Sequence, residues 1–168
     1  MPIFTPAISE VVTQDFIEQC CLAYKLDHSG YHGFYHWMRV LHNGRIIANL
    51  TGANIKVVEL FCLLHDTKRK NDNQDPLHGH RAALHAQSSR GLLFKTTDAE
   101  MEQLIEACTY HSDGHTDGDI TVQTCWDADR LDLGRVGIRP VPHRLCTEAA
   151  RLPSILEAAY ERSVGITG

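Results

Sequence analysis

The chain has 168 residues, 43% of them hydrophobic, and a formal net charge of −5 at pH 7. This length suits a single domain over residues 1–168, and the acidic balance argues against a protein that binds nucleic-acid backbones. No apolar run approaches the roughly 20 residues of a membrane helix, and Met1–Phe4 lacks the basic start of a secretory signal. We therefore expect a cytoplasmic protein with no membrane partner.

The cysteines agree with a reducing compartment. The chain has six, with no Cys-x-x-Cys pair, and most stand in apolar surroundings where a free thiol acts as a small hydrophobe. We expect reduced thiols and no zinc cluster built from Cys20, Cys21, Cys62, Cys108, Cys125 and Cys146.

The first half of the chain predicts helices joined by polar loops. Thr5-Pro6 suits a helix start, since proline is favoured at the first helical position. Apolar residues then recur at helical spacing. They are Ile8, Val11, Val12, Phe16, Cys20 and Tyr24. A loop over 27–33 precedes a second helix from about Gly33 to Leu50, which Gly52 closes.

Two more helices follow in the middle of the chain. Asn54 is placed to cap a strongly apolar helix that ends near Leu64. The charged segment 66–76 lacks periodicity and predicts a loop, and a fourth helix is expected over 77–90.

The second half opens with a capping box. Thr97 and Glu100 can satisfy each other's backbone donors and begin a helix that reaches His111. A turn is expected over 113–119 and an irregular stretch over 134–142.

The remaining elements are also predicted to be helical. Residues 120–124 alternate like a strand, but they are short and isolated, and 122–133 suits a helix. Residues 147–162 return to a helical pattern. The sequence therefore predicts an all-α bundle of five or more helices.

Four residues stand out because two imidazoles and two carboxylates can together hold one divalent metal ion. Each alone has an ordinary explanation, such as a packed histidine, a helix-terminal hydrogen-bond pair or a salt-bridge partner. They are His36, His65, Asp66 and Asp129. Their flanks carry the information, namely the segments 32–40, 57–64 and 128–131.

In this order and with these flanks, the sequence resembles the HD-domain superfamily of metal-dependent phosphohydrolases over about residues 31–137. That pattern has a histidine early in one helix, a His-Asp pair ending another, and a later Asp in an Ala-Asp-x-Leu setting. The resemblance implies a helical bundle around a metal held by His36, His65, Asp66 and Asp129. Asp127 competes for the fourth place, but the Ala-Asp-Arg-Leu word selects Asp129, and Asp127 would face elsewhere on a helix.

The implied ligand set suits Mn, Fe, Co, Ni or Zn, and Mg less well. Four protein ligands on an ion that accepts six leave positions for water and substrate oxygens. Such an ion can generate hydroxide near neutral pH and polarise a phosphoryl oxygen.

Further histidines suggest a larger site. The chain has 11 histidines. His78 lies in a segment that resembles the third-histidine segment of superfamily members with larger sites, and His111 ends the capped helix on its apolar face. Both are candidates for catalysis, for a second metal or for phosphate contacts, with hydrogen bonding to the ligand carboxylates as the alternative. We assign His80, His85 and His115 to the surface or to supporting roles.

Arginines would supply the other half of a phosphate site, because guanidinium groups bind phosphate oxygens in pairs. Arg69 and Arg39 are the candidates, with Arg39 alternatively bracing a carboxylate. Some HD-family phosphatases carry a Glu where this chain has Arg69. The water-activating group is therefore either Asp72 or Asp75 of the loop, or metal-bound hydroxide alone.

The favoured function is a metal-dependent phosphohydrolase acting on a small phosphorylated molecule, with nucleotides among the candidates. Asp66, Arg69, His78 and His111 are its predicted catalytic residues. An oxidative di-iron enzyme on the same scaffold and a non-catalytic metal- or ligand-binding module are the alternatives. A homodimer is the candidate assembly, since two-fold dimers are the commonest.

Overall fold

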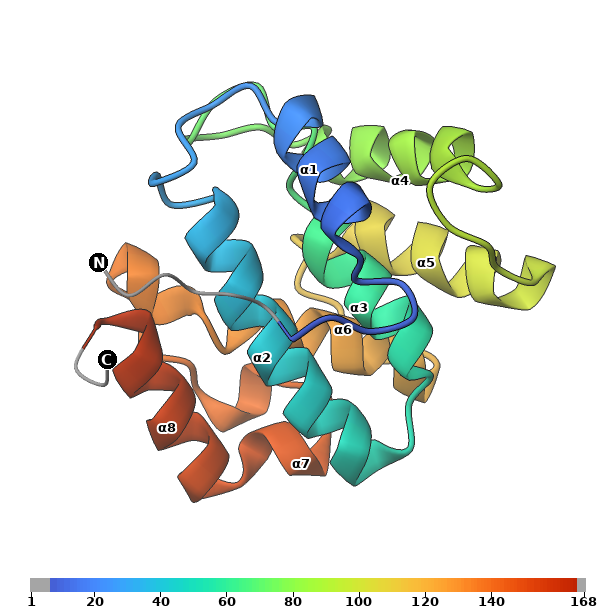
Figure 1. Ribbon diagram of the computed structural model, residues 1–168. Helices are drawn as coiled ribbons and strands as arrows, with labels where there is room; N and C mark the ends of the chain where they lie inside the picture. Colours follow the sequence, from blue (N-terminus) through green and yellow to red (C-terminus); the bar gives the residue numbers. More distant parts are fainter. Residues whose placement is uncertain (1–6, 166–168) are drawn as a thin grey trace.

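A computed structural model describes residues 7–165, and within them the chain is helical with no β-strand (Figure 1). The prediction of an all-α bundle with five or more helices is confirmed. The α-helices are α1 (Gln14–Ala23), α2 (Phe34–Thr51), α3 (Ile55–Leu64), α4 (His78–Ser89), α5 (Asp98–Tyr110), α6 (Ile120–Arg130), α7 (Glu148–Arg151) and α8 (Pro153–Ser163). Two short 3-10 helices, η1 (Leu133–Val136) and η2 (Pro142–Arg144), separate α6 from α7.

Helix α3 is the centre of the bundle. It passes between α2 on one side and α4 and α5 on the other, and α6 packs against both α2 and α3 (Figure 1). Every residue from Val57 to Leu64 is buried, because this helix is apolar almost all round and needs partners on every face. The end of α3 therefore lies deep inside the molecule, and His65 follows it directly.

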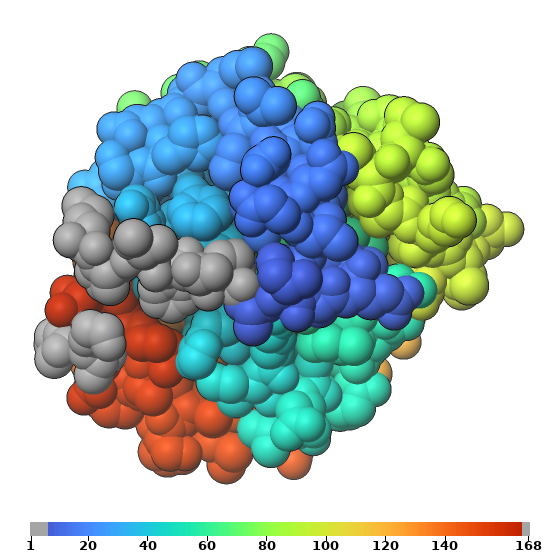
Figure 2. All heavy atoms as spheres, viewed as in Figure 1, coloured from blue at the N-terminus to red at the C-terminus, as the bar shows by residue number. Residues whose placement is uncertain are grey.

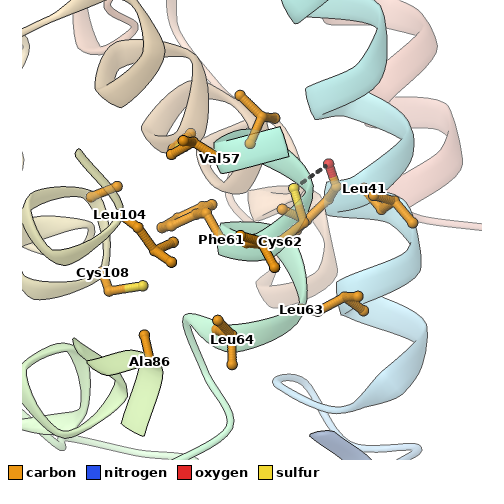
Figure 3. Packing of buried hydrophobic residues seen from close by; sticks show 14 of the residues in the cluster. Leu41, Val57, Phe61, Cys62, Leu63, Leu64, Ala86, Leu104 and Cys108 are labelled. Carbon is orange, nitrogen blue, oxygen red and sulfur yellow. Dashed lines mark hydrogen bonds between the residues drawn. The ribbon is translucent and has the colours of Figure 1, made fainter. Parts of the chain in front are cut away.

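The core is built around that helix. Figure 3 shows Phe61 of α3 turned towards Leu104 and Cys108 of α5, while Cys62 faces α2, where its Sγ donates to the Val40 carbonyl at 3.5 Å. A smaller cluster joins the end of the chain to the bundle. It contains Ile47, Leu131, Leu145, Ala150 and Ala159.

The first helix begins later than the sequence predicts. Thr5-Pro6 lies outside the described residues, and residues 7–13 are not helical, so the prediction for that stretch is wrong. Thr13 is the cap of α1, and its side chain accepts from the Phe16 N–H. The preceding residues lie along the surface beside α3, as the dark blue atoms of Figure 2 show.

Two polar contacts hold this N-terminal arm in place. The Ser9 hydroxyl donates to Glu59 of α3 at 2.5 Å, and Arg45 of α2 donates to the Ala7 carbonyl at 2.7 Å. Val11 and Val12 are both buried. The Ser9 N–H donates to the Val12 carbonyl at 3.2 Å and the Thr13 N–H to the Val11 carbonyl at 3.0 Å, so the arm is an irregular turn and not a helix.

Two further corrections concern the second half. Residues 120–124 are helical, because Asp119 caps α6 by accepting from the Thr121 N–H, and the helix ends at Arg130. The helix predicted over 147–162 is two helices, α7 and α8. Pro153 separates them, since proline lacks the amide hydrogen and disfavours helical backbone at Leu152, where ψ is 128°.

No helix among residues 7–165 has both the length and the hydrophobicity that crossing a membrane requires.

Replacing Leu104 with alanine should lower the free energy of unfolding by about 2–5 kcal/mol, because the side chain is fully buried and would leave a cavity against α3. Leu92→Ala is the matched control, since Leu92 is 83% exposed and should cost less than about 0.5 kcal/mol. Chemical denaturation followed by circular dichroism measures both. Equal losses would contradict this packing.

Candidate metal centre

Four side chains converge at the buried end of α3. His36 comes from the first turn of α2, His65 and Asp66 follow α3, and Asp129 lies in the last turn of α6. His36 Nε2 lies 3.1 Å from His65 Nε2, 3.4 Å from Asp66 Oδ2 and 3.2 Å from Asp129 Oδ1. His65 Nε2 is 3.5 Å from each of the same two carboxylate oxygens. The structure thus brings all four predicted ligands together.

Hydrogen bonds from the Nδ1 atoms fix the orientations of the two histidines. His65 Nδ1 donates to the carbonyls of Phe61 and Cys62 at 3.2 and 3.1 Å, and His36 Nδ1 donates to Asp132 Oδ2 at 2.6 Å. With the proton on Nδ1, each Nε2 presents its lone pair to the shared space. Two lone pairs 3.1 Å apart repel unless a cation or a proton lies between them.

The two carboxylates also require a cation between the ligand atoms. Asp129 Oδ1 is buried and receives no hydrogen bond while the facing Nε2 atoms of His36 and His65 are unprotonated, which is costly for an anionic oxygen. Burial raises the pKa of Asp129, but His36, His65 and Arg135 outweigh it and hold that pKa well below its usual range. Asp66 behaves in the same way: burial raises its pKa, but the surrounding imidazoles outweigh burial and hold that pKa well below its usual range. Both groups are therefore ionised at neutral pH.

Without a metal, the negative charge of these carboxylates favours a proton on His36. Burial and Arg135 lower the pKa of His36, but hydrogen bonds to Asp129, Asp132 and Asp66 outweigh them and raise it to about 9. The pocket of ligand atoms is thus a cation site by electrostatics as well as by geometry. Two imidazole nitrogens and two carboxylate oxygens fit a divalent transition metal.

A second group of ligand atoms adjoins the first. Asp66 turns its other oxygen, Oδ1, towards His78 Nε2 at 3.3 Å and His111 Nε2 at 3.5 Å. These two nitrogens are only 2.8 Å apart. Their Nδ1 atoms donate to the carbonyls of Asp75 and Cys108, so both Nε2 lone pairs again face each other. Asp66 therefore belongs to both groups of candidate ligands.

A glycine makes this second group possible. A Cβ on Gly79 would lie 2.4 Å from the Cys108 carbonyl oxygen, a distance that no side chain tolerates. The start of α4 can approach the end of α5 this closely only because the side chain is missing. That approach places His78 directly against His111.

Sequence reasoning missed two residues that support the ligands. Asp132, just past the end of α6, accepts from His36 and also from Arg39 Nε at 2.7 Å. Arg39 therefore braces a carboxylate, which was the alternative to a phosphate-binding role. His32 Nδ1 lies 3.1 Å from Asp66 Oδ2. Two spacings in the sequence could have indicated these roles. His32 precedes His36 by four residues, and Asp132 follows Asp129 by three.

Asp127 has a structural role. Its carboxylate accepts from the Cys146 N–H at 2.7 Å and from the Thr147 N–H and hydroxyl at 2.8 Å each. These bonds tie α6 to the start of α7 and leave no free oxygen for an ion. Asp127 thus holds two helices together, whereas Asp129, two residues later, faces the candidate metal site.

A cavity of about 760 Å³ opens onto the ligand atoms. His32, Asp66, His78, His111 and Asp129 form its inner end, while His36 and His65 lie beneath it, fully buried. Five arginines line it, against two carboxylates that are both candidate ligands. These are Arg69, Arg130, Arg135, Arg139 and Arg144. The loop acids Asp72 and Asp75 do not line it, so they are not placed to activate water there.

Two arginines flank the metal-binding carboxylates. Arg69 Nε donates to Asp66 Oδ1 at 3.2 Å, and its Nη1 donates to the carbonyls of Asn71 and Asn73. Arg135 donates from Nε to the Tyr31 carbonyl and from Nη1 to the Asp132 carbonyl, and its Nη2 lies 3.9 Å from Asp129 Oδ1. Each guanidinium is thus anchored on one edge and lines the cavity with the rest.

The chain is similar to known proteins over most of its length. The HD domain family model matches residues 33–134. The crystal structure of a predicted HD superfamily hydrolase from an uncultured Thermotogales bacterium is also similar, with a TM-score of 0.68 and 26% sequence identity. That similarity covers 91% of this chain and 87% of the other. No curated protein matches the chain.

The two neighbouring aspartates give a matched test. Asp129→Ala should abolish tight binding of Mn or Zn but keep the fold, because its Oδ1 faces the Nε2 atoms of His36 and His65 and, among the described residues, no backbone N–H donates to it. Asp127→Ala should cost about 2–4 kcal/mol of stability, because it leaves buried N–H groups without an acceptor, yet retain metal binding. Elemental analysis after dialysis and chemical denaturation measure the two effects. Loss of metal only in Asp127→Ala would refute the ligand assignment.

Proposed function

Because the chain belongs to the HD domain family, we propose that it is a metal-dependent phosphohydrolase acting on a small phosphorylated molecule. The predicted resemblance to that superfamily is confirmed, and the similar crystal structure supports a hydrolase. One observation carries the finer proposal. Buried ligand atoms for a divalent metal open into a cavity whose only carboxylates, among the described residues, are two of those ligands and whose other charged groups are cationic.

The proposed first metal site uses His36, His65, Asp66 and Asp129. When bound there, a divalent ion supplies a hydroxide near neutral pH and polarises a phosphoryl oxygen. Asp132 and the carbonyls behind His65 hold the imidazoles in the neutral tautomer that a metal requires.

Arg69 and Arg135 are proposed to bind the phosphate. Their anchored guanidiniums stand beside Asp66 and Asp129, so the two would approach a phosphoryl group from different sides of the ion. Guanidinium N–H groups form strong paired bonds with phosphate oxygens and stabilise charge that develops during transfer. Arg69 stands where some HD-family phosphatases carry a Glu, so this chain would have no carboxylate base at that position.

We propose that the second group, Asp66, His78 and His111, holds a second ion. Three residues are few for a transition metal, so water and substrate oxygens would complete its coordination. In a two-metal site, the attacking and leaving oxygens are each stabilised by an ion. His78 and His111 would then act through the metal or, with one ion only, by hydrogen bonding to the phosphate.

A di-iron oxidative enzyme is the second candidate, because the same two groups provide a histidine-rich site with a bridging carboxylate. The arginines favour the hydrolase, since an oxidation does not itself need five cationic side chains around the substrate. Turnover of phosphate esters without oxygen separates the two. A cytoplasmic location and a homodimer stay predictions.

Metal stoichiometry tests the second site. The native protein should bind two equivalents of Mn, and a double variant His78→Gln, His111→Gln should bind one, because the first four ligands remain. His85→Gln is the control, since His85 lies outside both groups. Calorimetric titration measures the stoichiometry. One equivalent in the native protein would limit the site to a single ion.

Phosphate release tests the reaction. With Mn, Co, Ni, Zn or Mg, the purified protein should hydrolyse at least one class among phosphomonoesters, phosphodiesters and nucleoside phosphates. Asp66→Asn should lower kcat by about 10³-fold or more, and Arg69→Ala should lower kcat/KM by roughly 10- to 100-fold, the loss of one charge-assisted contact to phosphate. Lys95→Ala, on the exposed turn before α5, should change neither. Metal-loaded protein that is silent towards the whole panel would exclude a phosphohydrolase.

A further inference from the structure

Resting on the proposed hydrolase, we propose that its substrate is a phosphate ester of a short aliphatic alcohol rather than a nucleotide. The cavity is far larger than a phosphate group, and about 760 Å³ lies within the range of pockets that enclose a whole small molecule. Its inner end is polar, and aliphatic side chains line much of the remainder. The residues concerned are Leu133, Val136, Ile138, Pro140, Val141 and Leu145.

This aliphatic wall comes from one continuous segment. It begins in η1, directly after Asp132, and continues past η2. The same segment carries Arg135, so the phosphate-binding arginine and the wall are a few residues apart. An ester whose phosphate contacts Arg135 would therefore lie with its alcohol against these side chains.

Several wall residues are exposed although they are apolar. Val136 is 39% exposed, Ile138 53% and Val141 37%, and all three line the same cavity. Single exposed apolar residues are ordinary, but a group of them facing one cavity is typical of a ligand-binding surface. Covering them with a hydrocarbon would remove apolar surface from water.

A purine or pyrimidine would find little to stack on. No Phe, Tyr or Trp of the described chain lines the cavity. Trp37, Trp126 and Phe94 are buried in the core, and Tyr35 lies outside the cavity. Two of the nearby arginines are also engaged: Arg130 donates to the His115 carbonyl, and Arg139 pairs with Glu157 and stacks on Tyr160. Base recognition by aromatic stacking therefore lacks its usual partners.

The outer rim limits the length of the alcohol. His143 and Arg144 line the cavity and are exposed, so the wall is apolar only between the metal end and this polar edge. A long alkyl chain would place its tail across charged groups. A short aliphatic body is the better fit.

A series of alkyl phosphates tests the wall. For the metal-loaded native protein, kcat/KM should rise from methyl to ethyl, butyl and hexyl phosphate by up to about fourfold per methylene, the value expected for burying each CH₂. Hexyl phosphate should exceed AMP and phenyl phosphate. A flat series, or a preference for AMP, would overturn this inference while leaving the phosphohydrolase intact. Turnover of a phosphodiester with none of these monoesters hydrolysed would also overturn this inference alone, whereas silence towards every ester, phosphodiesters included, would overturn both.

Matched variants locate the contact. In Ile138→Gln the ratio of kcat/KM for hexyl over methyl phosphate should fall at least tenfold. Ile55→Gln is the control, because Ile55 is similarly exposed at 45% but lies at the opposite end of α3 from the site. Circular dichroism verifies that both variants fold. An unchanged ratio in Ile138→Gln would overturn the placement of the alcohol on this wall.

Discussion

The Asp66 carboxylate is the constraint on which this structure depends. It is only 2% exposed, and its two oxygens face two different sets of imidazole nitrogens. An ionised carboxylate at that depth is costly unless cations or several donors surround it. Helices α2 and α4 and the end of α5 each bring a histidine to it. The bundle is therefore organised around a centre of negative charge that a metal would neutralise.

Carbonyl groups at helix ends orient the imidazoles of that centre. The last carbonyls of a helix have no partner within the helix, so they are available as acceptors. His65 uses that of Cys62 at the end of α3, and His111 uses that of Cys108 at the end of α5. Each bond satisfies a buried carbonyl and fixes an imidazole tautomer at once. Stability of the fold and readiness for metal thus come from the same hydrogen bonds.

What the sequence could reveal followed from local rules. The capping residues Asn54 and Thr97, together with apolar periodicity, predicted where α3 and α5 begin, and the flanking words identified the ligand candidates. Distant contacts were beyond reach. The irregular arm before α1 depends on Glu59 and Arg45 of other helices. The roles of Asp132 and Arg39 depend on a meeting of residues 93 positions apart. Neither is encoded in neighbouring residues.

The charge distribution reconciles an acidic protein with an anionic substrate. A net charge of −5 would repel a phosphate at long range, but salt screens that repulsion over about 10 Å. Inside the cavity, two carboxylates would be neutralised by metal while Arg69 and Arg135 keep their charge beside them. The local field is therefore positive at the place where the phosphate would bind. Because that field is equal for every phosphate ester, discrimination between substrates must come from the uncharged wall beyond it.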